Sequence, residues 1–197
     1  MDLQNILKKI YQIHIKKLNN LDQKNPKIMI LFSGTAGSGK SFIAKRIEEK
    51  FKGIRINNDD IRDIFRDHIA PNYDLSQVDL QKLLIDYSKF LYKNISKING
   101  FLILDSSMDR GFDMVEKTAE TNKYKIFLIR LDLSEEILIK QIKQRIERDP
   151  EPYLLDLARQ LEQHEKFSQR IVADYIISEQ NFDRFENLFE EIDRRIN

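Results

Sequence analysis

Residues 34–41 read Gly34-Thr35-Ala36-Gly37-Ser38-Gly39-Lys40-Ser41. A glycine, four further residues and then Gly-Lys-Ser give the spacing of a phosphate-binding P-loop. Glycines let the backbone N–H groups of such a loop point at phosphate oxygens, and the N-terminus of the following helix adds a positive partial charge. The motif predicts that Lys40 reaches the β- and γ-phosphates and that Ser41 offers its hydroxyl to Mg²⁺.

The segments on either side of this loop have the expected character. Residues 27–32 form a short apolar run after Pro26, which is typical of a buried parallel strand, and the residues from Phe42 to Ile47 continue as a helix. Strand, glycine loop and helix is the arrangement that a P-loop requires, whereas a plain glycine turn does not need lysine followed by serine. We therefore expect the stretch from Gly34 to Phe42 to bind a nucleotide.

Composition indicates one globular domain. The chain has 197 residues, of which 41% are hydrophobic, and its 33 basic and 32 acidic residues give a net charge of +1. Such a balance offers no long-range attraction for nucleic acid. No cysteine is present, which excludes disulfides and thiolate metal sites and is compatible with a reducing compartment. With no apolar run long enough for a membrane span and no signal peptide, we expect a cytoplasmic protein without a membrane partner.

A second informative stretch follows a short predicted strand at 54–56. Asp59 and Arg62 lie three residues apart at the start of a predicted helix, so both can share its non-core face. The carboxyl ends of parallel strands are where open α/β sheets bind ligands. Asp59 could accept the proton of an attacking hydroxyl there while Arg62 holds phosphate; a local ion pair near the helix N-terminus is the alternative interpretation. The reserve candidates for the base are Asp60 and Asp63, the latter paired with Arg66.

A third candidate ends the apolar run at 101–104. Asp105 stands where the aspartate of a Walker B-like strand joins the Mg²⁺ shell, and a simple strand-end cap is the alternative. The residues from Ser106 to Gly111 are expected to form a loop at the same edge of the sheet. The three histidines, His14, His68 and His164, lack metal-ligand spacing and are treated as non-ligands.

Helical periodicity predicts the remaining layers. An amphipathic helix is expected over 3–21, either packed on the domain or exposed as a partner surface. A capping box at Ser76 to Asp79 predicts the start of a long helix reaching Ile98. Arg145 and Arg148 lie near the end of a later helix, just before two prolines, so they could belong to a hinged lid or simply complement the helix dipole.

Strands and helices alternate along the whole chain. This pattern predicts an α/β fold of the P-loop NTPase type, a three-layer sandwich with about five parallel strands and helices on both faces. A guanine-nucleotide switch is disfavoured for two reasons. Residues 105–108 read Asp-Ser-Ser-Met rather than Asp-x-x-Gly, and residues 122–125 read Asn-Lys-Tyr-Lys rather than Asn-Lys-x-Asp. We therefore expect ATP, with Mg²⁺, as the nucleotide.

Taken together, the P-loop, the run from Ile56 to Arg62, the stretch from Leu104 to Ser107 and the region of Arg145 and Arg148 resemble the small P-loop kinases. These include polynucleotide 5′-kinase domains and zeta-toxin-like kinases, and the resemblance spans roughly residues 28–180. It implies Asp59 as the general base, Arg62 as a phosphate ligand and Arg145 or Arg148 as the lid arginine. The loop after Asp105 departs from many relatives by reading Ser-Ser-Met.

The sequence analysis thus predicts an ATP-dependent kinase with Mg²⁺. Its acceptor is a hydroxyl of a small molecule or of a nucleic-acid end, a nucleotide sugar being one alternative and an ATPase without acceptor another. The expected organisation is an N-terminal helical extension at 1–25 and a kinase domain at 26–197. Within that domain a substrate-covering helical region is expected at about 60–98 and a lid at about 145–152. The sequence does not specify an oligomeric state.

Overall fold

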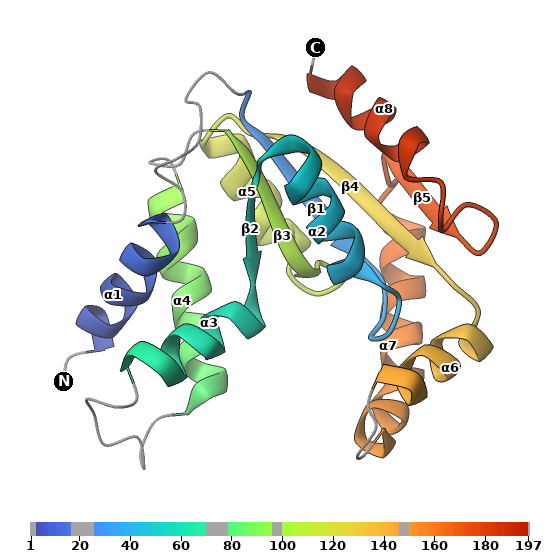
Figure 1. The fold of residues 1–197 in the computed structure, drawn as a ribbon, viewed down its shortest axis with the longest axis horizontal. Coiled ribbons are helices and arrows are strands. Elements are labelled where there is room, and N and C mark those ends of the chain that lie inside the picture. The colour runs from blue at the N-terminus through green and yellow to red at the C-terminus, as the bar shows by residue number, and fades with distance from the viewer. Residues whose placement is uncertain (1–2, 17–25, 70–78, 96–99, 146–149, 197) are drawn as a thin grey trace.

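The computed structural model describes residues 3–16, 26–69, 79–95, 100–145 and 150–196. Its centre is a parallel sheet with the strand order β2-β3-β1-β4-β5 (Figure 1). The strands are β1 (Ile28–Ser33), β2 (Ile54–Asn57), β3 (Phe101–Ser107), β4 (Lys125–Asp132) and β5 (Tyr175–Ser178). The predicted α/β P-loop NTPase fold, with five parallel strands and helices on both faces, is confirmed.

The helices are α1 (Leu3–Lys16), α2 (Lys40–Phe51), α3 (Asn58–Ile64), α4 (Leu80–Asn94), α5 (Phe112–Thr121), α6 (Glu135–Arg145), α7 (Glu151–Arg170) and α8 (Phe185–Ile196). A π-helical turn, Phe65–Ile69, continues α3. Arg145 is the last described residue of α6, and α7 starts at Glu151, directly after Pro150.

The two faces of the sheet are covered by different helices because neighbouring residues of a strand point to opposite sides. Met29 and Leu31 of β1 belong to one core, which α1, α3, α4 and α5 complete. Ile28 and Ile30 belong to the other core, where α2 and α8 pack. A smaller cluster, built around Leu138, Ile142 and Leu157, joins α6 to α7. The P-loop follows the end of β1, at the edge of the sheet to which all the strands point.

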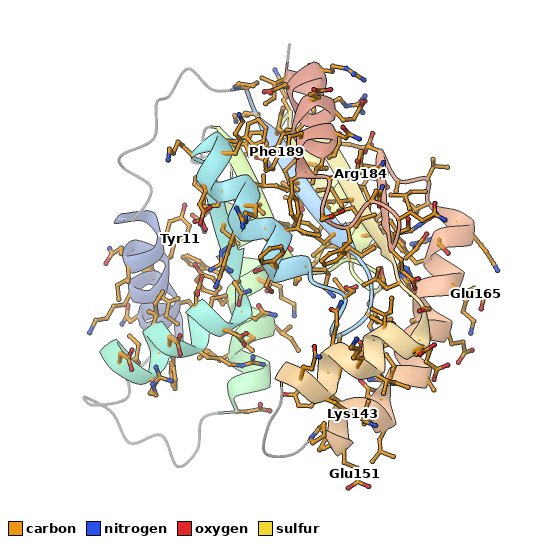
Figure 2. All side chains as sticks on the ribbon, turned by 45° about the vertical axis from the view of Figure 1, so that its right-hand side comes forward. Tyr11, Lys143, Glu151, Glu165, Arg184 and Phe189 are labelled. Atoms are coloured by element: carbon orange, nitrogen blue, oxygen red, sulfur yellow. The ribbon has the colours of Figure 1, made fainter. Side chains whose placement is uncertain are left out.

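The N-terminal helix packs on the domain. Ile10 is fully buried, and the hydroxyl of Tyr11 donates to the carbonyl oxygen of Asn94 at 3.2 Å. The Tyr11 ring meets Phe90 of α4 edge-on, with 5.5 Å between the ring centroids. Figure 2 labels Tyr11 on α1, across the molecule from Lys143 and Glu151 of α6 and α7. Residues 17–21 of the helix predicted over 3–21 lie outside the described residues.

Two predicted boundaries are wrong. α4 begins at Leu80, later than the capping box predicts, because Asp79 caps it by accepting from the backbone N–H of Lys82 at 3.1 Å. Strand β3 continues through Ser107, where a loop was expected. A register shift between Leu31 and Phe32 brings Ser107 opposite Phe32 and extends the pairing.

Candidate functional site

The P-loop adopts a backbone conformation that only glycine accommodates easily. Gly37 and Gly39 have φ of 79° and 92°, in the left-handed region. A Cβ atom at Gly39 would lie 2.7 Å from Cζ of Phe182, and one at Gly37 would lie 2.8 Å from Cγ1 of Ile142. The loop is therefore pressed against α6 on one side and the segment after β5 on the other.

The loop itself holds the Lys40 side chain. Its ammonium group donates to the carbonyl oxygens of Gly34 and Thr35 at 3.0 and 2.5 Å, and to Oγ of Ser38 at 3.2 Å. These acceptors keep a positive charge at the mouth of a loop whose backbone N–H groups can bind an anion. The ammonium group therefore lies within the P-loop, where the sequence analysis expects the phosphates.

Asp105 is the centre of a buried polar cluster. Its Oδ1 accepts from the hydroxyl of Ser41 at 2.9 Å, and its Oδ2 accepts from Arg55 and Asn57 at 2.6 and 2.5 Å. Burial opposes the charge on Arg55, but hydrogen bonding to Asp105 and the nearby Asp60 and Glu48 keep the pKa of Arg55 above its ordinary value. Sequence reasoning missed Arg55 and treated it only as part of a strand.

The Ser41 and Asp105 pair fits a hard divalent cation. A hydroxyl oxygen and a carboxylate oxygen lie 2.9 Å apart at the start of α2, and both are oxygen ligands that Mg²⁺ prefers. Across the described ranges, no cluster of three or more His, Cys, Asp or Glu residues could hold a metal ion. Any Mg²⁺ bound here would therefore need further oxygens from phosphate and water.

A cavity of about 500 Å³ joins the P-loop to α3 and is called the catalytic cavity here. Its lining includes Lys40, Ser41, Asp105, Asn57, Asn58, Asp59, Arg62, Ser106 and Tyr153. Asp59 and Arg62, 70% and 50% exposed, form an ion pair of 2.6 Å. The local pair considered in the sequence analysis is therefore present, and it lines the same cavity as the P-loop lysine.

The reserve carboxylates have other positions. Asp60 pairs with Arg55 at 2.9 Å, which ties it to the Asp105 cluster. Asp63 pairs with Arg66 at 3.0 Å, and both side chains are exposed outside the lining of the catalytic cavity. Geometry therefore favours Asp59 among the candidates. Arg148 and the side chain of Arg145 lie outside the described residues.

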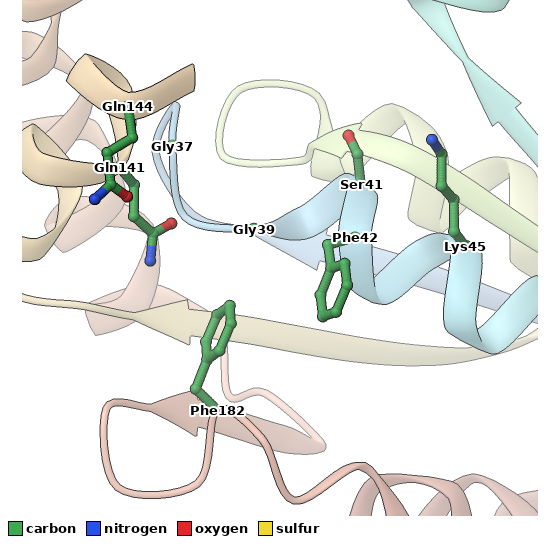
Figure 3. A pocket seen from close by; sticks show the side chains of 8 residues that line it. All are labelled: Gly37, Gly39, Ser41, Phe42, Lys45, Gln141, Gln144 and Phe182. Carbon is green, nitrogen blue, oxygen red and sulfur yellow. The ribbon is translucent and has the colours of Figure 1, made fainter. Parts of the chain in front are cut away.

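A second cavity, of about 610 Å³, lies on the other side of the P-loop and is called the Phe182 cavity here. Figure 3 shows Phe42 at the start of α2, Phe182 after β5, and Gln141 and Gln144 on α6 around it. An aromatic ring can stack on a nucleotide base, and amide side chains beside the ring can hydrogen-bond to the edge of that base. Of these residues, only Phe42 was singled out by sequence reasoning, because the others lie far along the chain from the motif.

A third, polar cavity of about 280 Å³ continues from the catalytic cavity, sharing Asn58 and Ser106 with it. It is called the Gln163 cavity here. Its other lining residues are Gly34, Thr35, Ser107, Asp109, Arg110, Gln160 and Gln163. Arg110 donates to the Gln163 side chain at 2.6 Å. Sequence reasoning singled out neither glutamine, since nothing in the sequence near either one signals a ligand site.

Within the described ranges, no helix is both long and apolar enough to cross a membrane.

Comparison with protein-family models gives one match, to AAA_18, described as an AAA domain, over residues 30–173. A search of curated protein sequences finds no significant match. Among solved structures, shikimate kinase from Bacteroides thetaiotaomicron is similar, with a TM-score of 0.52 and 16% identity over 83% of this chain and 98% of the other. APS kinase from Mycobacterium tuberculosis, solved with AMPPNP and APS, gives a TM-score of 0.51 and 13% identity over 86% and 99%. A protein of the PezAT toxin–antitoxin system of Streptococcus pneumoniae gives 0.52 and 16% over 82% and 75%. At these identities the likeness concerns the fold.

Proposed function

The chain belongs to the AAA_18 family of AAA domains, and on that premise we propose that it is an ATP- and Mg²⁺-dependent phosphotransferase acting on a hydroxyl group. One observation carries this proposal. Lys40 of the P-loop, the Ser41 and Asp105 pair, and Asp59 line a single cavity of about 500 Å³. This shared lining supports the proposal, because phosphate, metal and acceptor would then meet in one space.

The donor side would be built from the P-loop. Its backbone N–H groups and Lys40 would hold the phosphates, and Ser41 and Asp105 would hold Mg²⁺, which supplies neutralisation of phosphate charge. The base would enter the Phe182 cavity, where the Phe182 ring can stack on it and Gln141 and Gln144 can bond its edge. ATP is proposed because the chain lacks the guanine-reading pattern.

The acceptor side would face Asp59. In the transfer, the acceptor hydroxyl gives its proton to the Asp59 carboxylate and its oxygen attacks the γ-phosphorus. The bond from that phosphorus to the bridging oxygen breaks, and ADP leaves with the electron pair. Arg62 would bind the transferring phosphate and, like Lys40, stabilise the charge on its oxygens.

The acceptor's body would occupy the Gln163 cavity. Amide and hydroxyl groups such as those of Asn58, Ser106 and Ser107 bond uncharged polar groups, which suits a sugar or nucleoside portion. A nucleotide sugar and a nucleic-acid 5′ end both carry such a portion.

We also propose that residues 60–98 cover the acceptor, that 145–152 with Arg145 or Arg148 close as a lid, and that 1–25 extend a kinase domain of 26–197.

The test is transfer of label from γ-labelled ATP to separate panels of nucleosides, sugars, nucleotide sugars and 5′-hydroxyl oligonucleotides. Lys40→Ala serves as the blank, and Asp59→Asn should lower turnover by about 100-fold or more, the usual contribution of a general base. Asp63→Asn is the matched control, because Asp63 lies on the same helix outside the catalytic cavity. Label found in inorganic phosphate alone would replace the kinase by an ATPase.

A further inference from the structure

A histidine outside the proposed chemistry is buried between two carboxylates. His164 of α7 is 9% exposed. Its Nε2 lies 2.9 Å from Oδ1 of Asp132 at the end of β4, and its Nδ1 lies 3.2 Å from Oδ2 of Asp109 in the segment after β3. Nδ1 also lies 3.1 Å from the hydroxyl of Ser33, the residue before the P-loop. Three segments far apart in the sequence thus meet at one imidazole ring.

The charges around His164 indicate which form the ring takes. Arg130 donates to Oδ2 of Asp132 at 2.9 Å, so that Asp109, Asp132, Arg130 and a protonated His164 sum to zero. A neutral ring would leave one uncompensated negative charge, with Asp109 almost fully buried at 8% side-chain exposure. In a neutral ring one nitrogen carries a lone pair, which would face Asp132 if it is on Nε2 and Asp109 if it is on Nδ1. Only the lone pair of Nδ1 could be satisfied, by a hydrogen bond from the hydroxyl of Ser33.

The two pKa shifts agree with the charged form. Burial favours a neutral ring, but hydrogen bonds to Asp109 and Asp132 and the charges of both outweigh it, so the pKa of His164 rises above 6.5. Burial likewise opposes the charge on Asp109, yet the hydrogen bond from His164 brings the pKa of that carboxyl below its usual value. Both shifts favour the imidazolium over the neutral ring.

The same turn of α7 contacts the phosphate-binding loop. Gln160 lies one helical turn before His164, and its Oε1 accepts from the backbone N–H of Ala36 at 2.7 Å. Its own amide nitrogen donates to Asp156 at 2.9 Å, which fixes the orientation of the group. The ring that anchors α7 is therefore adjacent to the side chain that bonds the P-loop backbone.

We propose that His164 is a positioning residue whose imidazolium bridges Asp109 and Asp132 and thereby holds Gln160 against the P-loop. The bridge is present below pH 6.5 and is lost as the pH rises through the raised pKa of His164. Its consequence for phosphoryl transfer rests on the proposed function, whereas its charge state and its effect on nucleotide binding do not. Replacing the imidazolium by a neutral group should loosen the loop without touching the nucleotide.

The first test reads the ring directly. In ¹⁵N-labelled protein, the His164 signals are assigned by their loss in His164→Gln and followed against pH. We expect a midpoint above 6.5 in the wild type, with both ring nitrogens protonated below it, and a lower midpoint in Asp132→Asn. A neutral single tautomer at pH 6.5, as when Ser33 donates to Nδ1, would overturn the proposal.

The second test links the ring to the loop by titrating a non-hydrolysable ATP analogue into the protein by calorimetry. Wild-type affinity should fall about fivefold or more as the pH rises through the His164 midpoint, a coupling of ordinary size. The affinity of His164→Gln should be low and independent of pH over that range. If that variant does not fold, Asp132→Asn takes its place, with its pH dependence shifted to lower pH.

The control for both variants is Asp113→Asn. Asp113 forms an exposed ion pair with Arg170, which also ties α7 to a neighbouring segment but lies away from the P-loop. The Asp113→Asn variant should keep the wild-type affinity for the ATP analogue and the wild-type dependence of that affinity on pH. A pH-independent affinity in the wild type would refute the positioning role even if the ring is charged. If these variants no longer transferred the labelled phosphate from ATP but bound the ATP analogue as the wild type does, the result would contradict the positioning role and leave the proposed phosphotransferase function to be tested by its own variants.

Discussion

Replacing Arg55 by glutamine tests the polar cluster that supports the metal position. The Arg55 side chain is 11% exposed and pairs with Asp105 at 2.6 Å, Asp60 at 2.9 Å and Glu48 at 3.2 Å. Arg55→Gln leaves three carboxylates facing one another with no cation between them. The partners differ in burial, which determines the size of the effect.

The magnitude follows from Asp105. Its side chain is 1% exposed, whereas those of Asp60 and Glu48 are 30% and 41% exposed and can turn to solvent. Breaking a buried pair costs about 3–5 kcal/mol, and two accessible partners favour the lower end, about 3 kcal/mol. For a chain of this size that corresponds to a fall in Tm of about 6–12 °C.

The assay is urea unfolding at pH 7, with and without Mg²⁺ and a non-hydrolysable ATP analogue. If Ser41 and Asp105 hold Mg²⁺, the added ligands should stabilise Arg55→Gln more than the wild type, because the cation compensates a carboxylate that has lost its partner. Arg66→Gln, which removes an exposed arginine, should leave the unfolding midpoint unchanged. A loss below about 1 kcal/mol in Arg55→Gln would show that the Arg55 and Asp105 pair contributes no more than an exposed ion pair does.

Three further outcomes are expected. Gly39→Ala should lower the affinity for the ATP analogue more than about tenfold, because the new methyl would lie 2.7 Å from the Phe182 ring; Gly111→Ala, whose Cβ meets nothing within 4 Å, should bind normally in the same calorimetry. Phe182→Ala should weaken ATP binding by about 1–3 kcal/mol, the contribution of base stacking, and should leave the binding of inorganic triphosphate unchanged. The unfolding free energy of the wild type should decrease as the pH rises through the raised pKa of His164, since the folded state loses the bridge there, and should be flat over that range in His164→Gln.

The sequence predicted those parts of the fold that are encoded locally. A P-loop is a contiguous motif, and the central strands β1, β3 and β4 contain near-continuous apolar runs. Each can therefore be recognised without knowing its neighbours. Asp105 was identified because it ends such a run. The structure adds that its carboxylate lies 2.9 Å from Ser41.

The residues that were missed depend on contacts between distant segments. Arg55 lies in a strand of four residues, where one charged side chain predicts only solvent exposure, yet strand β3 places Asp105 next to it, 50 positions along the chain. His164 and Ser33 are 131 positions apart. The extension of β3 through Ser107 likewise depends on a register shift in β1, which no pattern within residues 101–107 reveals.

Asn57 connects the metal side of the site with the acceptor side. Its amide nitrogen donates to Oδ2 of Asp105 at 2.5 Å, and its amide oxygen accepts from the backbone N–H of Asp59 at 2.6 Å. The first contact leaves Oδ1 of Asp105 for Ser41, and the second caps α3 and fixes the turn that carries Asp59. Since one planar amide makes both contacts, a rotation that releases one also releases the other. The groups proposed for metal and acceptor are therefore positioned together, which a transfer reaction requires because its donor and acceptor oxygens must lie in line.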